Sequence, residues 1–208
     1  MSLKHSYTFI APFYDAFLTR ATYAARRKSL VQLTDLPPQN VLLMGVGTGL
    51  DLPHLPHQHR YFGIDLNAAM LHRVKPRIQE LPLGLKLSIL RGDVQRLPLA
   101  SASVDTVVLH LILAVVPEPT LCLREAVRVL RPGGQLLIFD KFLRRGERGW
   151  KRWLNPLSRH VATRLDVIFE DVLDHVGGMH VASNQPVLAG NWFRLIRLLK
   201  PSLQGARG

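Results

Sequence analysis

The sequence predicts an α/β fold in which helices cover both faces of a doubly wound, mostly parallel sheet of seven strands. Short apolar runs alternate with helical segments through the first two thirds of the chain. The run at residues 104–111 is largely apolar, as expected of a parallel strand that is buried on both faces. A glycine-rich turn follows the first apolar run, at the position where an open parallel sheet binds its ligands.

The first two thirds of the chain divide into nine predicted elements. In order they are a helix at 9–36, a strand at 40–45, a broken helix at 51–59, a strand at 60–65, a helix at 68–81, strands at 86–91 and 104–111, a helix at 119–130 and a strand at 135–140. Pro37 and Pro38 end the first helix, whereas Pro53 and Pro56 interrupt the third element, because proline lacks an amide hydrogen. Pro76 predicts an irregular turn in the helix at 68–81.

The last third departs from this alternation. A basic segment at 141–165 precedes a predicted helix at 166–176, which two consecutive glycines end. Strands at 181–188 and 192–199 then form a predicted C-terminal antiparallel hairpin. We expect one domain over residues 1–208, with a helical cover at 1–36 and a substrate-side, membrane-facing insertion at 141–165.

Composition places the chain among globular proteins. It has 208 residues, of which 47% are hydrophobic and 20% are charged, enough for one α/β domain with a sizeable core. No apolar run reaches the roughly 20 residues that a membrane-spanning helix needs, and the N-terminus does not resemble a secretion signal. The single cysteine, Cys122, is expected to be a buried thiol. These observations favour a cytoplasmic protein.

The chain is strongly basic, with a formal net charge of +12. Such a surface attracts polyanions such as an anionic membrane or a nucleic acid, although a generally basic proteome gives the same balance. Within the segment at 141–165, residues 144–153 hold five cations, two tryptophans and a single acid, Glu147. This mixture is typical of a membrane interface, while a solvated basic lid and a nucleic-acid groove are the alternatives.

The glycine turn reads Gly45-Val-Gly47-Thr-Gly49, and Asp65 ends the next apolar run about twenty residues later. Glycine allows a sharp turn and a close approach of the backbone to a ligand. The acid can accept hydrogen bonds from two vicinal ribose hydroxyls. The sequence therefore predicts a nucleotide-type site at the edge of a parallel sheet.

The third glycine comes one residue earlier than in the dinucleotide pattern G-x-G-x-x-G. Gly92-Asp93, Ser103-Val-Asp105 and Leu130-Arg-Pro-Gly-Gly134 accompany the three following strands. With these motifs the sequence resembles the class I S-adenosylmethionine-dependent methyltransferases over roughly residues 13–200. It is similar to the branch of the ubiquinone/menaquinone C-methyltransferases and the small bacterial phosphatidylethanolamine N-methyltransferases. The resemblance implies a Rossmann-like fold and S-adenosylmethionine as cofactor.

The resemblance also implies roles for particular residues. Nine are expected to contribute to the cofactor or substrate site: Tyr14, Gly45, Gly47, Gly49, Asp65, Leu66, Asp93, Val94 and His110. The glycines would line the methionine portion, Asp65 would bind the ribose and Leu66 would pack beside the adenine. Asp93 and the amide of Val94 would meet the adenine edge. His110, facing the methyl group or the acceptor, and Tyr14, covering the cofactor, are the candidate catalytic residues.

One position departs from the family's pattern. The family usually has an acid two residues before the first glycine, where it helps to hold the charged amino group of the cofactor; here that residue is Leu43. Losing one charge-assisted hydrogen bond costs about 1.5–3 kcal/mol. Asp51, just past the turn, or a backbone carbonyl could compensate.

Methyl transfer from a sulfonium is an in-line displacement that depends on alignment of the reacting atoms. The leading hypothesis is a lipid or amphiphilic acceptor, with the phosphatidylethanolamine nitrogen as the best single choice, at an anionic membrane surface on the inner membrane face. The alternatives are a quinone-ring or small-molecule methyltransferase, a non-catalytic protein with this fold, and an RNA methyltransferase. A nucleic-acid partner is not expected, because the sequence has no added RNA-binding module. A bound metal is not expected, because the histidines lack ligand spacing with cysteines or acids.

Overall fold

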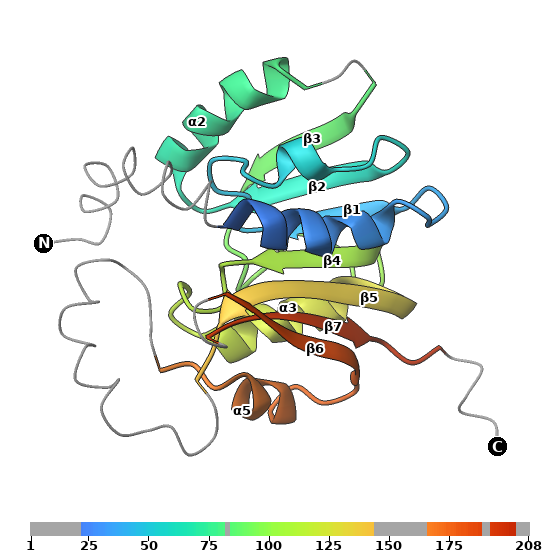
Figure 1. The fold of residues 1–208 in the computed structure, drawn as a ribbon, viewed down its shortest axis with the longest axis vertical. Coiled ribbons are helices and arrows are strands. Elements are labelled where there is room, and N and C mark those ends of the chain that lie inside the picture. The colour runs from blue at the N-terminus through green and yellow to red at the C-terminus, as the bar shows by residue number, and fades with distance from the viewer. Residues whose placement is uncertain (1–21, 82–83, 144–165, 189–191, 203–208) are drawn as a thin grey trace, which may run out of the picture.

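The computed structural model describes residues 22–81, 84–143, 166–188 and 192–202. Its strands form one seven-stranded sheet in the order β3-β2-β1-β4-β5-β7-β6. The strands are β1 (Asn40–Met44), β2 (Arg60–Asp65), β3 (Lys86–Arg91), β4 (Val104–His110), β5 (Leu130–Lys141), β6 (His180–Leu188) and β7 (Phe193–Leu199). β1 to β5 pair in parallel, whereas β7 runs antiparallel to both β5 and β6 (Figure 1). The predicted doubly wound sheet with a C-terminal hairpin is therefore confirmed.

The strand order reverses between β1 and β4. From β1 the chain proceeds outward to β2 and β3, then returns to place β4 on the other side of β1. Leu43 pairs with Val108 and Met44 pairs with Leu109, so the two strands end side by side. In open α/β sheets, ligands bind at the carboxyl ends of the strands at this reversal.

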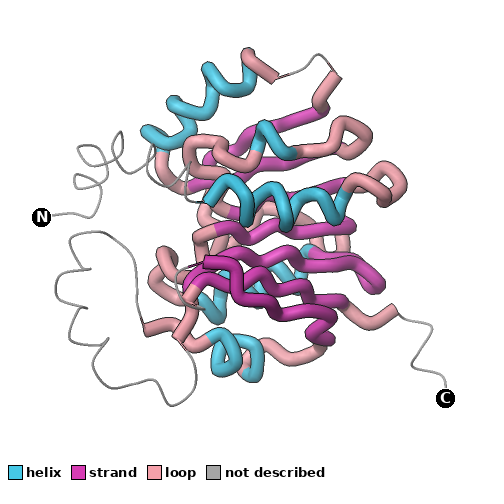
Figure 2. The backbone as a smooth tube through the Cα atoms, in the orientation of Figure 1, coloured by secondary structure: helices cyan, strands magenta, loops and turns pink. Residues whose placement is uncertain are grey.

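Helices cover both faces of the sheet (Figure 2). They are the helix at 22–30, the short 3-10 helices η1 (Val31–Leu33) and η2 (Leu52–His54), α2 (Ala68–Gln79), α3 (Pro119–Val129) and α5 (Phe169–Asp174). Leu30 and Val74 join alternate strand residues such as Leu43 and Val108 in one buried cluster. α3 and α5 contribute to the larger cluster on the opposite face, where Cys122 is buried as predicted.

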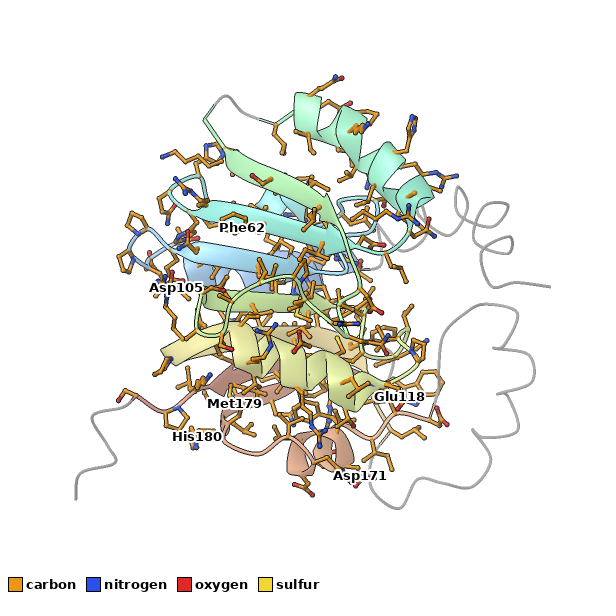
Figure 3. The ribbon with its side chains drawn as sticks, turned by 180° about the vertical axis from the view of Figure 1, so that it is seen from behind. Phe62, Asp105, Glu118, Asp171, Met179 and His180 are labelled. Atoms are coloured by element: carbon orange, nitrogen blue, oxygen red, sulfur yellow. The ribbon has the colours of Figure 1, made fainter. Side chains whose placement is uncertain are left out.

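Figure 3 views the sheet from the side that α3 covers. Asp105, near the amino end of β4, and Glu118, the residue before α3, lie toward opposite ends of the strands in this view. Asp105 accepts hydrogen bonds from the amide of Asn40 and from Arg131. It therefore ties the beginning of β1 to β5, at the edge away from the carboxyl ends of the strands.

The predicted boundaries change where a particular residue intervenes. The element at 51–59 shortens to η2, since Pro53 and Pro56 leave too few amides to continue a helix. In contrast, α2 runs through Pro76 to Gln79. β4 ends at His110 because Leu111 adopts a left-handed backbone with φ of 56°. The helix predicted at 166–176 is reduced to the six residues of α5.

Candidate functional site

The glycine turn leaves β1 and contacts the end of β2. The amides of Gly45 and Val46 both donate to the carbonyl of Ile64, at 2.8 and 3.1 Å. Gly45, Gly47 and Gly49 all have positive φ values, of 75°, 56° and 83°. An L residue with a side chain rarely adopts such a backbone, so the turn depends on glycine.

The three glycines differ in their surroundings. A Cβ at Gly45 would lie 2.6 Å from Cδ1 of Ile112, and one at Gly49 would lie 2.6 Å from Cγ2 of Val74. Among the residues that the structure describes, a Cβ at Gly47 would meet only the carbonyl oxygen of Gly45, at 3.9 Å. Gly45 and Gly49 thus permit close packing within the protein, whereas Gly47 faces open space where a ligand can approach.

Asp65 ends β2 beside this turn. Its Oδ2 accepts the amide of Gly47 and its Oδ1 accepts the amide of Asn67, both at 2.8 Å. Burial raises the pKa of Asp65, and hydrogen bonds from the backbone of Asn67, Gly47 and Leu66 oppose that rise by favouring the carboxylate. Each oxygen retains capacity to accept a further hydrogen bond, so the carboxylate fits the hydroxyls of a ribose.

The residues predicted to hold the adenine lie next to Asp65. The amide of Gly92 donates to the carbonyl of Asp65 at 3.0 Å, which joins the ends of β2 and β3. Leu66 is 59% exposed, and an exposed apolar side chain here offers a surface for a ring. Asp93 accepts the amide of Gln95 at 2.8 Å, while Val94 is largely buried. The structure therefore brings Asp65, Leu66, Asp93 and Val94 together at one edge of the sheet.

His110, at the end of β4, is buried in a polar cluster. Its Nδ1 lies 2.8 Å from Oδ1 of Asp51, and its Nε2 lies 2.9 Å from Oγ of Ser29. The ring also packs edge-on against Phe139. Both ring nitrogens are therefore engaged, with Nδ1–H donating to Asp51 and Nε2 accepting from Ser29 in the neutral ring.

Arg26 completes this cluster. Its Nη1 donates to Oδ1 of Asp51 at 2.7 Å, and its Nε donates to Oγ1 of Thr22 at 3.0 Å. Burial alone would raise the pKa of Asp51, but Arg26 and His110 outweigh it and hold that pKa well below its usual range. The cluster joins the helix at 22–30, the segment after the glycine turn and the end of β4.

The sequence reasoning missed Ser29 and treated Arg26 only as part of a basic helix face. Neither residue belongs to a recognisable motif, and the separation of Ser29 from His110 exceeds 80 positions along the chain. No local signal could have found them, because helix 22–30 precedes β1 in the chain and reaches the carboxyl end of β4 only in the tertiary fold. Leu43 lies in the apolar cluster that includes Leu30, and is 2% exposed.

Asp140, near the end of β5, supports the loop after β4. Its Oδ2 accepts the amide of Ala114 at 3.1 Å and its Oδ1 accepts the amide of Lys141 at 2.8 Å. Burial raises the pKa of Asp140 to about 6, although these backbone hydrogen bonds favour the charged form. Burial also lowers the pKa of Lys141.

This raised pKa predicts a specific pH dependence of stability. Asp140 has a higher pKa in the folded state than in the unfolded chain. Its contribution to the free energy of unfolding is therefore fully present below the unfolded-state pKa, and it is lost as the pH rises through the folded-state pKa of about 6. The difference from the ordinary value of 3.8 corresponds to about 3 kcal/mol. We expect the unfolding free energy of the wild type, relative to Asp140→Asn, to fall by up to that amount between about pH 4 and pH 7. Urea unfolding across this range measures it, and a constant difference would contradict it.

Some predicted features lie outside the described residues. Tyr14 and most of the basic segment at 141–165 belong to this group, as does the part of the N-terminal helix before residue 22. Within the described ranges, no group of three or more histidine, cysteine or acidic side chains could hold a metal ion. The helices of the described part include none long and apolar enough to span a membrane.

A glycine turn where the strand order of a parallel sheet reverses, with an acid at the end of the next strand, is typical of an enzyme that uses a nucleoside cofactor. Residues 42–138 match the family model described as a methyltransferase domain. The chain is an S-adenosylmethionine-dependent methyltransferase that resembles the class I members of this group.

Two relatives illustrate its similarities. The phosphatidylethanolamine N-methyltransferase of Cereibacter sphaeroides is 29% identical over 190 residues, which cover 88% of this chain and 91% of that protein. The ubiquinone/menaquinone biosynthesis C-methyltransferase of Syntrophotalea carbinolica is 27% identical over 177 residues, or 78% of this chain and 70% of that protein.

Solved structures agree with the fold. An S-adenosylmethionine-dependent methyltransferase of Thermotoga maritima superposes with a TM-score of 0.68 at 19% identity, covering 95% of this chain and 100% of that chain. The geranyl diphosphate C-methyltransferase of Streptomyces coelicolor, solved with S-adenosyl-L-homocysteine, gives a TM-score of 0.70 at 13% identity, covering 85% and 76% of the two chains.

Proposed function

We propose that this methyltransferase acts on a lipid or lipid-like amphiphile, and that its acceptor is the nitrogen of phosphatidylethanolamine. The observation that carries the proposal is the similarity to the phosphatidylethanolamine N-methyltransferase over nearly the full length of both chains. The net charge of +12 supports it, because a basic surface attracts anionic lipid headgroups. The proposed location is cytoplasmic, at the inner face of the membrane.

We propose that the carboxyl edge of β1, β2 and β3 holds the cofactor. Asp65 accepts the two ribose hydroxyls, and the open side of Gly47 admits the methionine portion. Leu66 packs against the adenine ring, while Asp93 and the amide of Val94 bind its edge. Gly45 and Gly49 shape the turn, and Tyr14 remains the predicted cover.

S-adenosylmethionine supplies an activated methyl group on a sulfonium, and the protein must align the acceptor with it. In this proposal His110 acts through position, because both of its ring nitrogens are already hydrogen-bonded. Asp140 holds the loop that follows β4, close to the end of the strand that carries His110. An ammonium acceptor must lose its proton before transfer, because an amine attacks the methyl group only in its neutral form.

The test uses labelled cofactor and liposomes of defined composition. Vesicles of phosphatidylglycerol with phosphatidylethanolamine should yield labelled mono- or dimethylated lipid, whereas vesicles of phosphatidylglycerol alone should yield none. Activity should fall when anionic lipid is replaced by phosphatidylcholine, because attraction of the basic protein to the surface is lost. Failure to label any lipid would overturn the lipid proposal.

A second candidate is methylation of a quinone ring, which the similarity to the ubiquinone/menaquinone C-methyltransferase favours. This candidate would be selected if a demethylated quinone in detergent accepts the label while phosphatidylethanolamine remains unlabelled. A ring carbon requires a base to form the attacking anion, so its rate should depend on pH differently from that of an amine.

A further inference from the structure

We propose that Asp51 binds the amino group of the methionine portion of the cofactor. Asp51 is a buried acid two residues after Gly49, the last glycine of the turn. The proposal rests on the cofactor, which belongs to the methyltransferase class, and is independent of the acceptor.

The position of Asp51 is fixed by contacts on three sides. The amide of Leu52 donates to the carbonyl of Gly49 at 3.1 Å, which folds the chain back directly after the turn. The carboxylate contacts His110 at the end of β4 and Arg26 on the helix at 22–30. It therefore lies at the carboxyl end of the β1–β4 pair, where the strand order reverses.

Leu43 lies on the same face of the sheet as His110 but further from the carboxyl ends of the strands. Its partner across the strand pair is Val108, two residues before His110 and hence on the same face of the sheet. The Leu43 side chain is buried among apolar residues, next to Val108 and not next to His110. Asp51, in the segment after the turn, contacts the end of β4, so its carboxylate lies outside this apolar cluster.

The electrostatics of Asp51 suit an ammonium ligand. Arg26 and His110 both bind Oδ1, whereas Oδ2 has no hydrogen-bond partner among the described residues. The same two groups hold the pKa of Asp51 well below its usual range, so the carboxylate stays ionised. An ionised oxygen with unused acceptor capacity forms a strong, charge-assisted hydrogen bond with an ammonium group.

The test separates recognition of the amino group from support of the fold. Calorimetry measures the binding of S-adenosylhomocysteine and of its deaminated analogue, which keeps the carboxylate and lacks the amino group. In the wild type the parent compound should bind more tightly. Asp51→Asn should weaken the parent compound by roughly 10- to 100-fold and the analogue by less than about threefold. Asp35→Asn, at an exposed position, is the matched control and should change neither value.

Removing one member of a buried ion pair can also unfold the protein. The double variant Arg26→Met/Asp51→Asn therefore provides a second measurement, since it leaves no unpaired guanidinium. The preference for the parent compound should be lost in this variant as well. An unchanged preference, or an equal loss of affinity for both compounds, in a variant that folds would overturn the proposal. These outcomes do not depend on whether any lipid is methylated.

Discussion

Replacing Asp65 with alanine should weaken the binding of S-adenosylhomocysteine by roughly 100- to 1,000-fold, because the two proposed charge-assisted hydrogen bonds to the ribose, at about 1.5–2 kcal/mol each, would be lost. The substitution also removes the acceptor that holds the amide of Gly47 at 2.8 Å. The glycine turn then loses its link to the end of β2. Isothermal titration calorimetry of the wild type and the variant measures the change directly.

Two controls identify the cause of this loss. A 2′-deoxy analogue of the ligand lacks one of the hydroxyls, so the penalty of Asp65→Ala should be smaller for it than for the parent compound. Asp35→Ala removes an exposed acid and should leave both affinities unchanged. If Asp65→Ala weakened the two ligands equally, the carboxylate would hold the turn without contacting the ribose.

Alanine at Gly49 and alanine at Gly47 should have different consequences, although both glycines have positive φ values. A left-handed backbone costs a residue with a side chain about 1–2 kcal/mol. At Gly49 the new Cβ also meets Val74 and Leu52 at 2.6 and 2.9 Å, and such overpacking adds about 1–3 kcal/mol. We therefore expect Gly49→Ala to lower the free energy of unfolding by about 2–5 kcal/mol.

Gly47→Ala should affect the ligand more than the fold. Its Cβ meets no atom of the described residues closer than 3.9 Å, so only the backbone term of about 1–2 kcal/mol applies to stability. The methyl group, however, occupies space that the proposed cofactor site requires, and affinity should fall by at least about tenfold, or 1.4 kcal/mol. Urea unfolding and calorimetry on the same two proteins measure both effects. Equal losses of stability with no loss of affinity at Gly47 would contradict the proposed site.

Local pattern was sufficient to predict much of the fold. The apolar run from Val41 to Met44, the glycines after it and Asp65 at the end of the next run indicate a strand, a turn and a second strand. Buried parallel strands are short and apolar, and turns need glycine, so both leave a clear trace in the sequence. The same reasoning located the closing hairpin, β6 and β7, with errors of about one residue at its ends.

Boundaries were harder where local and tertiary preferences compete. Pro76 lies inside α2, although a proline was expected to disturb the helix there. Leu111 ends β4 through a left-handed backbone, which its amide stabilises by donating to the carbonyl of Phe139 at 2.7 Å. Neither result follows from the helix or strand propensity of the residue, because packing in the tertiary structure outweighs these local preferences.

The sequence alone determined the class of the protein: its alternating strands and helices, its glycine turn and the acid that follows. Only the tertiary structure decided the environment of each polar group. It enclosed His110 between Asp51 and Ser29, and it brought Arg26 from the N-terminal helix to the end of β4. Local hydrogen bonding and side-chain periodicity act over a few residues, whereas a buried charge requires partners that the fold gathers from distant segments.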